Sequence, residues 1–446
     1  MDLPKNAVIL LCLTCSLLPN RINFGTISAI NFETSVDQRI ISLEKSEVNW
    51  NQTYGGRSTD EAYALIQTKE GGLALAGYTW SYGAGFADMW LVRTDLNGVV
   101  QWSRTYGHQL VLDQAHALIQ SNEGGYVLAG YTQSYDESVD KLREDLWLVK
   151  TNATGGLQWN LTYGESLGFE EAFALIQTSD EGYVIAGHKN FNFLLLKVDL
   201  NGIKLWNQTY GKDISRERAY CLIQTIDGGF ALAGYKRPFG GEEDIWFVKT
   251  NMNGELQWNQ TYGGPGDELA EVLVETRDKG YAFAGYTTSF GAGKKDMWLV
   301  KTDAQGIMQW NQTYGRAGDE GAKALLQTKD GGYALAGYTS SYGAGKWDMW
   351  LIKTDAAGNI QWNQTFGGPE NDHAKDLLQT KEGNFVLAGS TRSYGAGGLD
   401  MWLVKIQGTK KQVIKIPPHV FFGSLLFFGI SLVLGVLIIY QRKKRH

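Results

Sequence analysis

The chain is poor in cysteine, which excludes a disulfide framework. Only three of its 446 residues are Cys, and Cys12 and Cys15 lie in an apolar N-terminal run to which we assign no further role. Cys221 is then the only thiol in the rest of the chain, so no intramolecular disulfide can form there. It occupies a repeat position that holds Ala in four other repeats, so we expect a small buried side chain there. Stability must come from packing.

Signatures of common catalytic sites are also missing. The six His residues show no metal-ligand spacing, and no Gly-rich phosphate loop leads from a strand into a helix. No set of Ser, His and Asp stands out from the rest of the chain. These absences disfavour an enzyme and a bound cofactor without excluding either.

Basic clusters are scarce in the main body. Residues 47–408 contain 30 Lys and Arg against 43 Asp and Glu, a net charge of −13. Phosphate contacts need clustered Lys and Arg, so a nucleic-acid partner is excluded. With 43% hydrophobic and 20% charged residues, the composition also excludes a disordered chain.

One long hydrophobic run is present, at residues 420–440. Its 21 uncharged positions match the roughly 20 residues that a helix needs to cross a bilayer. The basic residues 441–446 follow at once, and such a flank normally stays in the cytoplasm. We therefore predict a single transmembrane helix with a cytoplasmic C-terminus; a buried core helix is the alternative.

The N-terminus carries features of a signal peptide. Lys5 precedes twelve apolar residues, 7–18, which are too few to span a membrane. We place the end of the signal peptide near residue 30. Both termini therefore predict export, with the main body outside the cytoplasm and held at the cell membrane.

A tryptophan recurs every 47 to 57 residues, at Trp50, Trp102, Trp159, Trp206, Trp258, Trp310 and Trp362. Between two such tryptophans, four β-like runs bounded by turn residues are predicted; in the clearest repeat they are 322–328, 333–339, 349–354 and 359–366. Seven such repeats predict an all-β, seven-bladed β-propeller over residues 47–408, followed by a linker at 409–419. An open solenoid is the alternative, but its end repeats would be atypical.

The last repeat runs out after Lys405, before its fourth strand. A matching strand stands at the start of the chain, at residues 48–54. We predict that this N-terminal strand completes the last blade and removes an exposed edge.

The recurring stretch T-D-x-x-G-x-x-x-W, as in Thr302, Asp303, Gly306 and Trp310, resembles the tryptophan-docking repeat of quinoprotein-like propellers of exported prokaryotic and archaeal proteins. The resemblance implies that each Trp wedges between blades and that each Gly permits the preceding turn. Quinoprotein enzymes usually have eight blades, adjacent cysteines and a calcium site. This chain offers seven repeats and a lone Cys221, so the enzymatic part of the resemblance fails.

An acidic residue stands two residues before the predicted first strand of every repeat: Asp60, Asp113, Glu170, Glu217, Glu268, Glu320 and Asp372. Because first strands lie nearest the axis of a propeller, we expect this acidic ring at one mouth of the central channel. It could hold a cation, with Ca²⁺ as the candidate, or receive a basic partner. Alternatively, each carboxylate accepts hydrogen bonds from backbone N–H groups of its own loop.

The second and third repeats depart most from the consensus. Repeat two has extended loops at 107–112 and 136–144, whereas repeat three has only residues 188–191 in place of the SYGAG loop. A long flap beside a missing loop would form a notch. We place partner specificity there, on a face that also carries Tyr and Phe residues suited to a protein or carbohydrate ligand.

Seven N-x-T sequons are candidate glycosylation sites in an exported chain: Asn51, Asn152, Asn160, Asn207, Asn259, Asn311 and Asn363. Asn and Thr also simply suit a strand at these positions. Taken together, the sequence predicts a membrane-anchored propeller that binds a protein or glycan at the cell surface. The alternative is an extracytoplasmic enzyme, either a glycan hydrolase or lyase or a quinoprotein-like enzyme, with a cation or cofactor at the channel mouth.

Overall fold

The computed structural model describes residues 30–35, 38–45, 48–136, 141–164, 168–211, 215–407 and 410–416. The predicted signal peptide and transmembrane helix fall almost wholly outside these ranges. No helix within them has the length and hydropathy of a membrane span. The chain forms two compact units, Val48–Gly408 and the pair of flanking segments.

The larger unit contains seven four-stranded antiparallel sheets. Blade one comprises β4 (Asp60–Gln67), β5 (Leu73–Thr79), β6 (Asp88–Thr94) and β7 (Val100–Tyr106). Blade two comprises β8 (Asp113–Gln120), β9 (Tyr126–Asp136), β10 (Lys141–Thr151) and β11 (Leu157–Tyr163). Blade three comprises β12 (Glu170–Gln177), β13 (Tyr183–Lys189), β14 (Asn192–Val198) and β15 (Lys204–Tyr210).

The remaining blades repeat this order. Blade four comprises β16 (Ser215–Gln224), β17 (Phe230–Pro238), β18 (Asp244–Thr250) and β19 (Leu256–Tyr262). Blade five comprises β20 (Glu268–Glu275), β21 (Tyr281–Thr287), β22 (Asp296–Thr302) and β23 (Met308–Tyr314). Blade six comprises β24 (Glu320–Gln327), β25 (Tyr333–Thr339), β26 (Asp348–Thr354) and β27 (Ile360–Phe366). Blade seven comprises β28 (Asp372–Gln379), β29 (Phe385–Thr391), β30 (Asp400–Ile406) and β3 (Val48–Tyr54).

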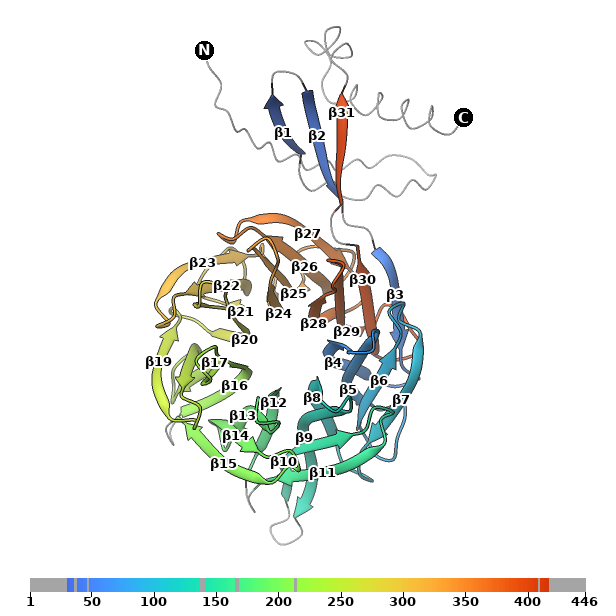
Figure 1. Cartoon of the computed structure of the whole chain (residues 1–446), viewed down its shortest axis with the longest axis vertical. Coiled ribbons are helices and arrows are strands. Elements are labelled where there is room, and N and C mark those ends of the chain that lie inside the picture. The colour runs from blue at the N-terminus through green and yellow to red at the C-terminus, as the bar shows by residue number, and fades with distance from the viewer. Residues whose placement is uncertain are drawn as a thin grey trace. The chain divides into compact units, whose positions relative to one another are not determined.

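The sheets stand around a central axis, with the first strand of each blade innermost (Figure 1). The predicted seven-bladed β-propeller is therefore confirmed. The middle strands are buried along their whole length, as in β5 and β6, because both faces of each sheet pack against neighbouring blades. Their Leu, Val, Ala and Trp side chains form one apolar layer at every blade junction.

The ring is closed by the N-terminal strand, as predicted. β3 pairs antiparallel with β30 over Val48 to Tyr54, and completes blade seven. A hydrogen bond between the inner strands of blades seven and one also joins the two ends of the propeller chain. Asp376 occupies a position that is Ala in four other blades, and its Oδ2 accepts the backbone N–H of Leu65 at 2.7 Å. The two ends of the ring are thus joined at its outer and inner edges.

Each blade docks on the next through the recurring tryptophan and a tyrosine. In blade five, Trp258 of the preceding blade lies against the turn at Gly306, where a Cβ atom would come within 2.7 Å of the ring. The hydroxyl of the fourth-strand tyrosine donates to the carbonyl of this turn glycine, for example from Tyr314 to Gly358 at 2.7 Å. The tryptophan-docking geometry implied by the resemblance is therefore present; membership of the quinoprotein-like group itself stays a prediction.

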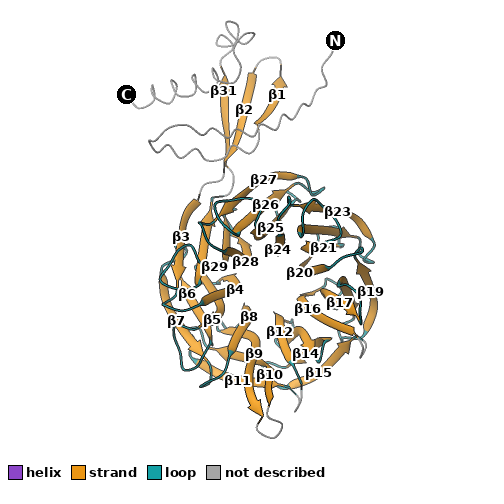
Figure 2. Ribbon diagram, turned by 180° about the vertical axis from the view of Figure 1, so that it is seen from behind, coloured by secondary structure: helices purple, strands orange, loops and turns teal. Residues whose placement is uncertain are grey.

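The two ends of the axis differ. The turn face carries the tight turns between first and second strands, such as residues 68–72, whereas the loop face carries the longer loops before third strands, such as residues 80–87 (Figure 2). Val48 and Phe385 both pair with Ile406, and Phe385 directly follows a tight turn. Both ends of the propeller chain therefore leave from the turn face, in blade seven.

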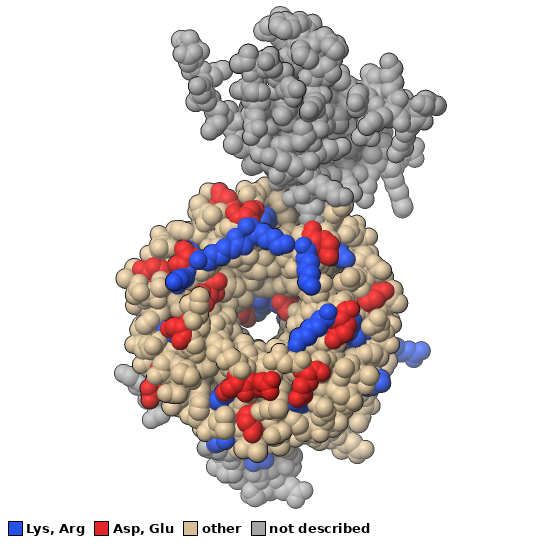
Figure 3. All heavy atoms as spheres, viewed as in Figure 1, with Lys and Arg blue, Asp and Glu red and all other residues tan. Residues whose placement is uncertain are grey.

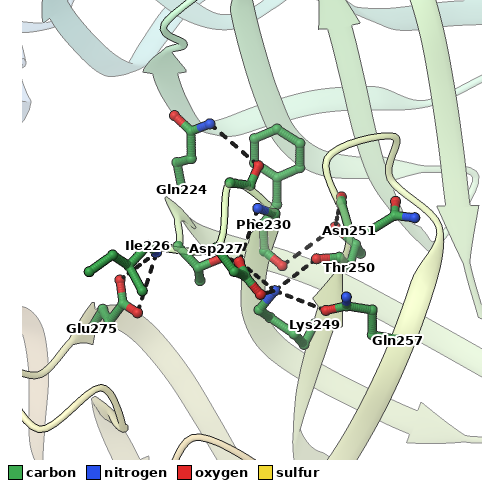
Figure 4. A network of polar contacts seen from close by, with 12 residues as sticks. Gln224, Ile226, Asp227, Phe230, Lys249, Thr250, Asn251, Gln257 and Glu275 are labelled. Atoms are coloured by element: carbon green, nitrogen blue, oxygen red, sulfur yellow. Dashed lines mark hydrogen bonds and ion pairs between the residues drawn. The ribbon is translucent and has the colours of Figure 1, made fainter.

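A buried cation supports most of the tight turns. In blade four the Lys249 ammonium, 3% exposed, lies 2.8 Å from the Asp227 carboxylate and also donates to Gln257 and the Thr250 carbonyl (Figure 4). Lys197, Lys301 and Lys353 form equivalent pairs in their own blades. Burial opposes ionisation of Asp227, but hydrogen bonds from Lys249 and Thr225 outweigh it and lower the pKa of this carboxyl to about 2. The pair ties the turn to the third strand.

Replacing Asp227 with Asn is expected to lower the free energy of unfolding by about 1–2 kcal/mol at pH 7, because Lys249 keeps its charge and loses its counter-ion. A lowered carboxyl pKa means stability that is present above pH 4 and lost as the pH falls towards 2. Asp227→Asn should flatten this acid slope in thermal unfolding scans. Replacement of the exposed Glu242 with Gln is the control, and an equal effect there would contradict the assignment.

The smaller unit is a three-stranded sheet built from both flanking segments. Its strands are β1 (Ile30–Ser35), β2 (Gln38–Lys45) and β31 (Lys410–Ile416), in the order β1-β2-β31. β2 pairs antiparallel with β31 from Arg39 opposite Ile416 to Lys45 opposite Lys410. Part of the segment expected to be a linker therefore forms a strand.

Candidate functional site at the channel mouth

The acidic ring opens the innermost strands at the loop face, but its carboxylates do not face solvent. All seven residues are at most 2% exposed. Glu320 shows why: its carboxylate accepts the backbone N–H of Arg316 at 3.0 Å, the Thr339 hydroxyl at 2.9 Å and the Ser341 N–H at 3.1 Å. Asp60, Asp113, Glu268 and Asp372 are bonded to their loops in the same way.

This geometry matches the second of the two alternatives, in which each carboxylate secures its own loop. Across the described residues, no group of three or more His, Cys, Asp or Glu side chains is arranged to hold a metal ion. The acidic ring therefore explains how the loops are held in place. The chemistry that differs between blades lies one residue further along the strand.

Six different residue types occupy that next position in the seven blades, and only Glu occurs twice. It holds Glu61, Gln114, Glu171, Arg218, Leu269, Gly321 and His373, which we call the wall positions. The residue that precedes Asp88, or its repeat equivalent in another blade, lies beside the first strand of the next blade, as shown by backbone bonds such as Glu320 N–H to the Lys295 carbonyl. These rim positions are Ala87, Glu144, Phe191, Glu243, Lys295, Trp347 and Leu399. Wall and rim together line the mouth of the channel at the loop face.

Two residues below the wall, the inner strands carry a belt of touching side chains. Four are aromatic: the ring centroids of Tyr63 and His116, and of His116 and Phe173, are 5.1 Å apart, and Phe173 to Tyr220 is 4.8 Å. The belt continues through Glu271, Lys323 and Lys375 of blades five to seven.

Charged contacts complete the belt. Glu271 forms an ion pair with Lys323, and the Lys375 ammonium lies 5.1 Å from the Tyr63 ring. Burial and then the charge of Lys323 lower the pKa of Lys375. The belt lies on the inner strands beneath the wall and rim and has an aromatic half and a charged half. We call the wall, rim and belt residues together the cup.

A pair of carboxyl groups marks the junction of blades two and three. Glu144 of the rim lies within hydrogen-bond reach of Glu171 of the wall, and Gln133 also donates to Glu144 at 3.0 Å. Burial and then the neighbouring Glu144 raise the pKa of Glu171 to about 7, with Arg218 partly opposing both. One proton shared by two carboxyl groups can be given up or accepted near neutral pH.

His188 stands opposite Glu171 on the adjacent strand. It is 1% exposed, and its Nδ1 atom has no hydrogen-bond partner among the described residues. Burial, then Arg218 and His116, lower its pKa to about 3, so the ring is neutral at physiological pH. A buried imidazole nitrogen without a partner usually costs stability, which makes it a candidate contact for a ligand atom.

The turn of blade three is conformationally strained. Asn190 and Phe191 have φ values of 49° and 69°, a region that L residues with large side chains rarely adopt. The Phe191 ring is 38% exposed, and the Arg216 guanidinium lies 5.2 Å from its centroid. Glycine would fit this turn better, so the aromatic side chain is retained at a cost in stability.

The predicted flap of blade two is a hairpin rather than a loop. β9 and β10 continue four residue pairs beyond the consensus, from Gln133 opposite Glu144 to Asp136 opposite Lys141 (Figure 1). At the place of the predicted notch, the structure thus has the extended β9–β10 hairpin in blade two and the short turn between β13 and β14 in blade three.

Sequence reasoning missed two tryptophans that belong neither to the docking series nor to the third-strand series, Trp90, Trp147, Trp246, Trp298, Trp350 and Trp402. Trp347 stacks on Tyr338 at 4.9 Å with an interplanar angle of 9°, and its ring is 5.0 Å from His373. Trp80 is 45% exposed and lies 6.2 Å from Phe86 on the loop of blade one. Subtracting the repeat tryptophans from the total would have singled out both.

The sequon asparagines are all exposed, as glycosylation requires. Five of them also accept a hydrogen bond from a third-strand tryptophan, for example Asn311 from Trp298 at 3.1 Å. Asn152 instead caps its turn, accepting the N–H groups of Thr154 and Gly156. A structural reason for Asn therefore exists at most of these positions, whether or not they carry glycans.

Replacing Glu171 with Gln is expected to change the pH dependence of stability. A folded-state pKa raised from 4.5 to about 7 means that the folded chain binds more protons in this window. The free energy of unfolding therefore falls as the pH rises from 4.5 to 7. Glu171→Gln should remove this fall and gain on the order of 1–3 kcal/mol at pH 8. Glu61→Gln, at the same position of blade one, is the control; parallel curves for wild type and Glu171→Gln would contradict the prediction.

The fold and this cup define the chain as a seven-bladed β-propeller with a polar, blade-specific channel mouth. No protein-family model matches it. It is 26% identical over 179 residues to the regulatory protein FlaEY of Caulobacter vibrioides, which covers 34% of this chain and 19% of that protein. The chain thus matches only about a fifth of that relative's length.

Among solved structures, it is similar to a protein of unknown function from Dyadobacter fermentans, with a TM-score of 0.49 and 12% identity over 81% of this chain and 99% of that one. A streptogramin B lyase has a TM-score of 0.48 and 11% identity over 80% of this chain and 98% of that one. Similarity at this level does not bear on function or ligand, and the fold rests on the strand order itself.

Proposed function

We propose that the protein is a cell-surface binding module whose ligand, a protein segment or a glycan, is held at the channel mouth. One observation carries this proposal. The repeats keep the residues that build the fold, including the acidic ring, the docking tryptophans and the turn glycines, yet almost all wall positions differ from blade to blade. Packing requires the first set alone, so the variation at the mouth is best explained by an asymmetric ligand.

Membrane anchoring belongs to the same proposal. The sequence supports a signal peptide at residues 1–30, a transmembrane helix at 420–440 and a cytoplasmic tail at 441–446. Both chain ends leave the propeller at the turn face, whereas the cup opens at the loop face. An anchored propeller would therefore present its cup on the side opposite the anchor connections.

The experiment is to screen the propeller against a glycan array and a displayed peptide library, and then to compare variants on the best ligand. Trp347→Ala and Arg218→Ala should weaken binding at least about tenfold, since aromatic and Arg anchors dominate such sites. Phe191→Gly should weaken binding while raising the unfolding temperature, because it relieves the strained turn. Lys204→Ala, on the outer strand of blade three, is the control.

The blade-two hairpin gives a second comparison. Replacing residues 136–144 with the SYGAG loop of the other blades should abolish ligand capture and leave the unfolding temperature unchanged. Full binding by both this chain and Trp347→Ala would refute the loop-face assignment.

Glu171 also favours a second candidate, an extracytoplasmic glycan hydrolase or lyase. A protonated carboxyl beside an ionised one is the arrangement that general acid and base catalysis uses. Such an enzyme would lose turnover in Glu171→Gln while still binding the glycan. A binding module would show a modest change in affinity and no turnover in either form.

A further inference from the structure

The turn face carries an arc of exposed cations that no part of the proposed function uses. In each blade, the residue after the first-strand threonine or serine begins the tight turn. In blades five, six, seven and one it is basic, and Lys279 adds a further charge in blade five; the basic arc comprises Arg277, Lys279, Lys329, Lys381 and Lys69. Blades two to four have Asn122, Ser179 and Ile226 instead.

Figure 3 shows this face: Lys and Arg side chains follow one another over blades five, six and seven, with carboxylates beside them, and carboxylates also lie over blades two to four. The basic side chains lie flat and reach towards the next blade. Arg277 donates to the Lys329 carbonyl at 2.9 Å, and the Lys329 ammonium to the Lys381 carbonyl at 3.3 Å. Lys69 likewise donates to the Ser121 carbonyl at 3.1 Å.

The carboxylates beside the arc offset its charge only in part. Asp278 and Asp330 stand next to arc residues in the same turns, but each is ion-paired at 2.8 Å with the buried lysine beneath it. Glu70 stands beside Lys69, and Glu382 beside Lys381, in the other two turns. The acceptors of Arg277, Lys329 and Lys69 are neutral carbonyl and amide oxygens. The four turns of the arc therefore carry five exposed cations against these two further carboxylates, in a propeller whose net charge is −13.

We propose that the turn face docks on an anionic lipid surface through the basic arc. Both chain ends leave the propeller on this face, in blade seven, which lies within the arc. Only 13 residues separate Ile406 from the apolar run that begins at Val420, so the chain can span at most about 45 Å between them. An acidic propeller held this close to lipid headgroups would be repelled unless its basic side faced them.

The charge pattern thus fits an anionic lipid surface as the ligand better than it fits a soluble acidic polymer. Binding of a polymer would not require the arc to share a face with the chain ends. Each Lys or Arg near an anionic membrane is attracted to it, and salt screens this attraction. The arc therefore suffices to orient a propeller that the proposed transmembrane segment would hold nearby.

The test uses the propeller alone, residues 48–408, because every blade including its closing strand is complete within this unit. It is sedimented with vesicles of phosphatidylcholine, pure or containing about 30% phosphatidylglycerol, at about 0.1 M and about 0.5 M salt. We expect binding to the anionic vesicles at low salt only.

The arc variant combines Lys69→Gln, Arg277→Gln, Lys329→Gln and Lys381→Gln. Its vesicle partition coefficient should fall at least about tenfold. The matched control removes four exposed cations from the loop face, Arg57→Gln, Lys294→Gln, Lys346→Gln and Arg392→Gln, and should bind like wild type. Unfolding temperatures show whether both variants keep the fold.

Three results would overturn the proposal. The arc variant could bind vesicles as well as the control does, or both variants could lose binding equally, which would indicate unspecific attraction. The wild-type propeller could also ignore anionic vesicles yet bind polygalacturonate in a parallel sedimentation assay, in which case the arc would recognise an acidic polymer. None of these results depends on the loop-face ligand.

Discussion

A chain that begins at residue 55 is expected to unfold at least about 10 °C below the full propeller, or to aggregate. It lacks β3, so β30 becomes an open edge with unpaired N–H and C=O groups. It also loses the Trp50 ring against Gly98 and the hydrogen bond from Tyr54 to the same glycine at 2.6 Å. Thermal unfolding followed by circular dichroism measures the loss.

A circular permutant separates the loss of the strand from the loss of its position. It starts at residue 57 and carries residues 48–54 after Ile406 through a short glycine-rich linker. The permutant should recover most of the unfolding temperature, because the β3 pairing with β30 is restored. If the truncated chain has the same unfolding temperature as the full propeller, the closing strand does not stabilise the ring.

The second large effect is expected at Gly306. This residue has a φ of +77°, and an added Cβ would meet two Trp258 ring atoms at 2.7 and 2.9 Å. Gly306→Ala combines backbone strain of about 1–2 kcal/mol with overpacking of about 1–3 kcal/mol. We expect it to lower the free energy of unfolding by about 3 kcal/mol, measured by denaturant titration.

Gly331 supplies the matched control for the backbone term. Its φ is +88°, and no atom lies within 4 Å of the Cβ position. Gly331→Ala should therefore cost only the backbone strain, about 1 kcal/mol. Equal costs at both glycines would show that the tryptophan contact contributes little to blade docking.

The fold was predictable because every repeat has the same order of strand-like runs and turn residues. In the clearest repeat, the second and fourth strands were placed within one residue, Tyr333–Thr339 and Ile360–Phe366, because Gly and Asp mark the turns on both sides. The first strand was placed two residues late. Glu320 begins it, and an acidic residue at a strand start gives no hydrophobic signal.

The site was predictable only as a location. Repetition singled out the acidic ring, yet repetition favours residues that build the blade, and these carboxylates are buried beneath their loops. The wall, belt and rim residues follow no pattern, which is why sequence reasoning passed over Glu171 and Trp347. The strand pairing of residues 38–45 with 410–416 was also missed, because no periodic signal links two segments so distant in sequence.

Ring closure imposes an order on the synthesis of the protein. Trp402 donates a hydrogen bond to Asn51, which is 351 residues earlier in the chain. The first strand of the propeller can therefore pair only after nearly the whole chain has been synthesised. Until then the growing chain is an open row of blades, an unfinished arc with an unpaired strand edge at each end. Contacts this distant in sequence form slowly, and the unfinished arc can join a neighbouring nascent copy instead. If the chain is exported, as proposed above, folding has to finish on the far side of the membrane, and the unfinished arc meets this hazard there.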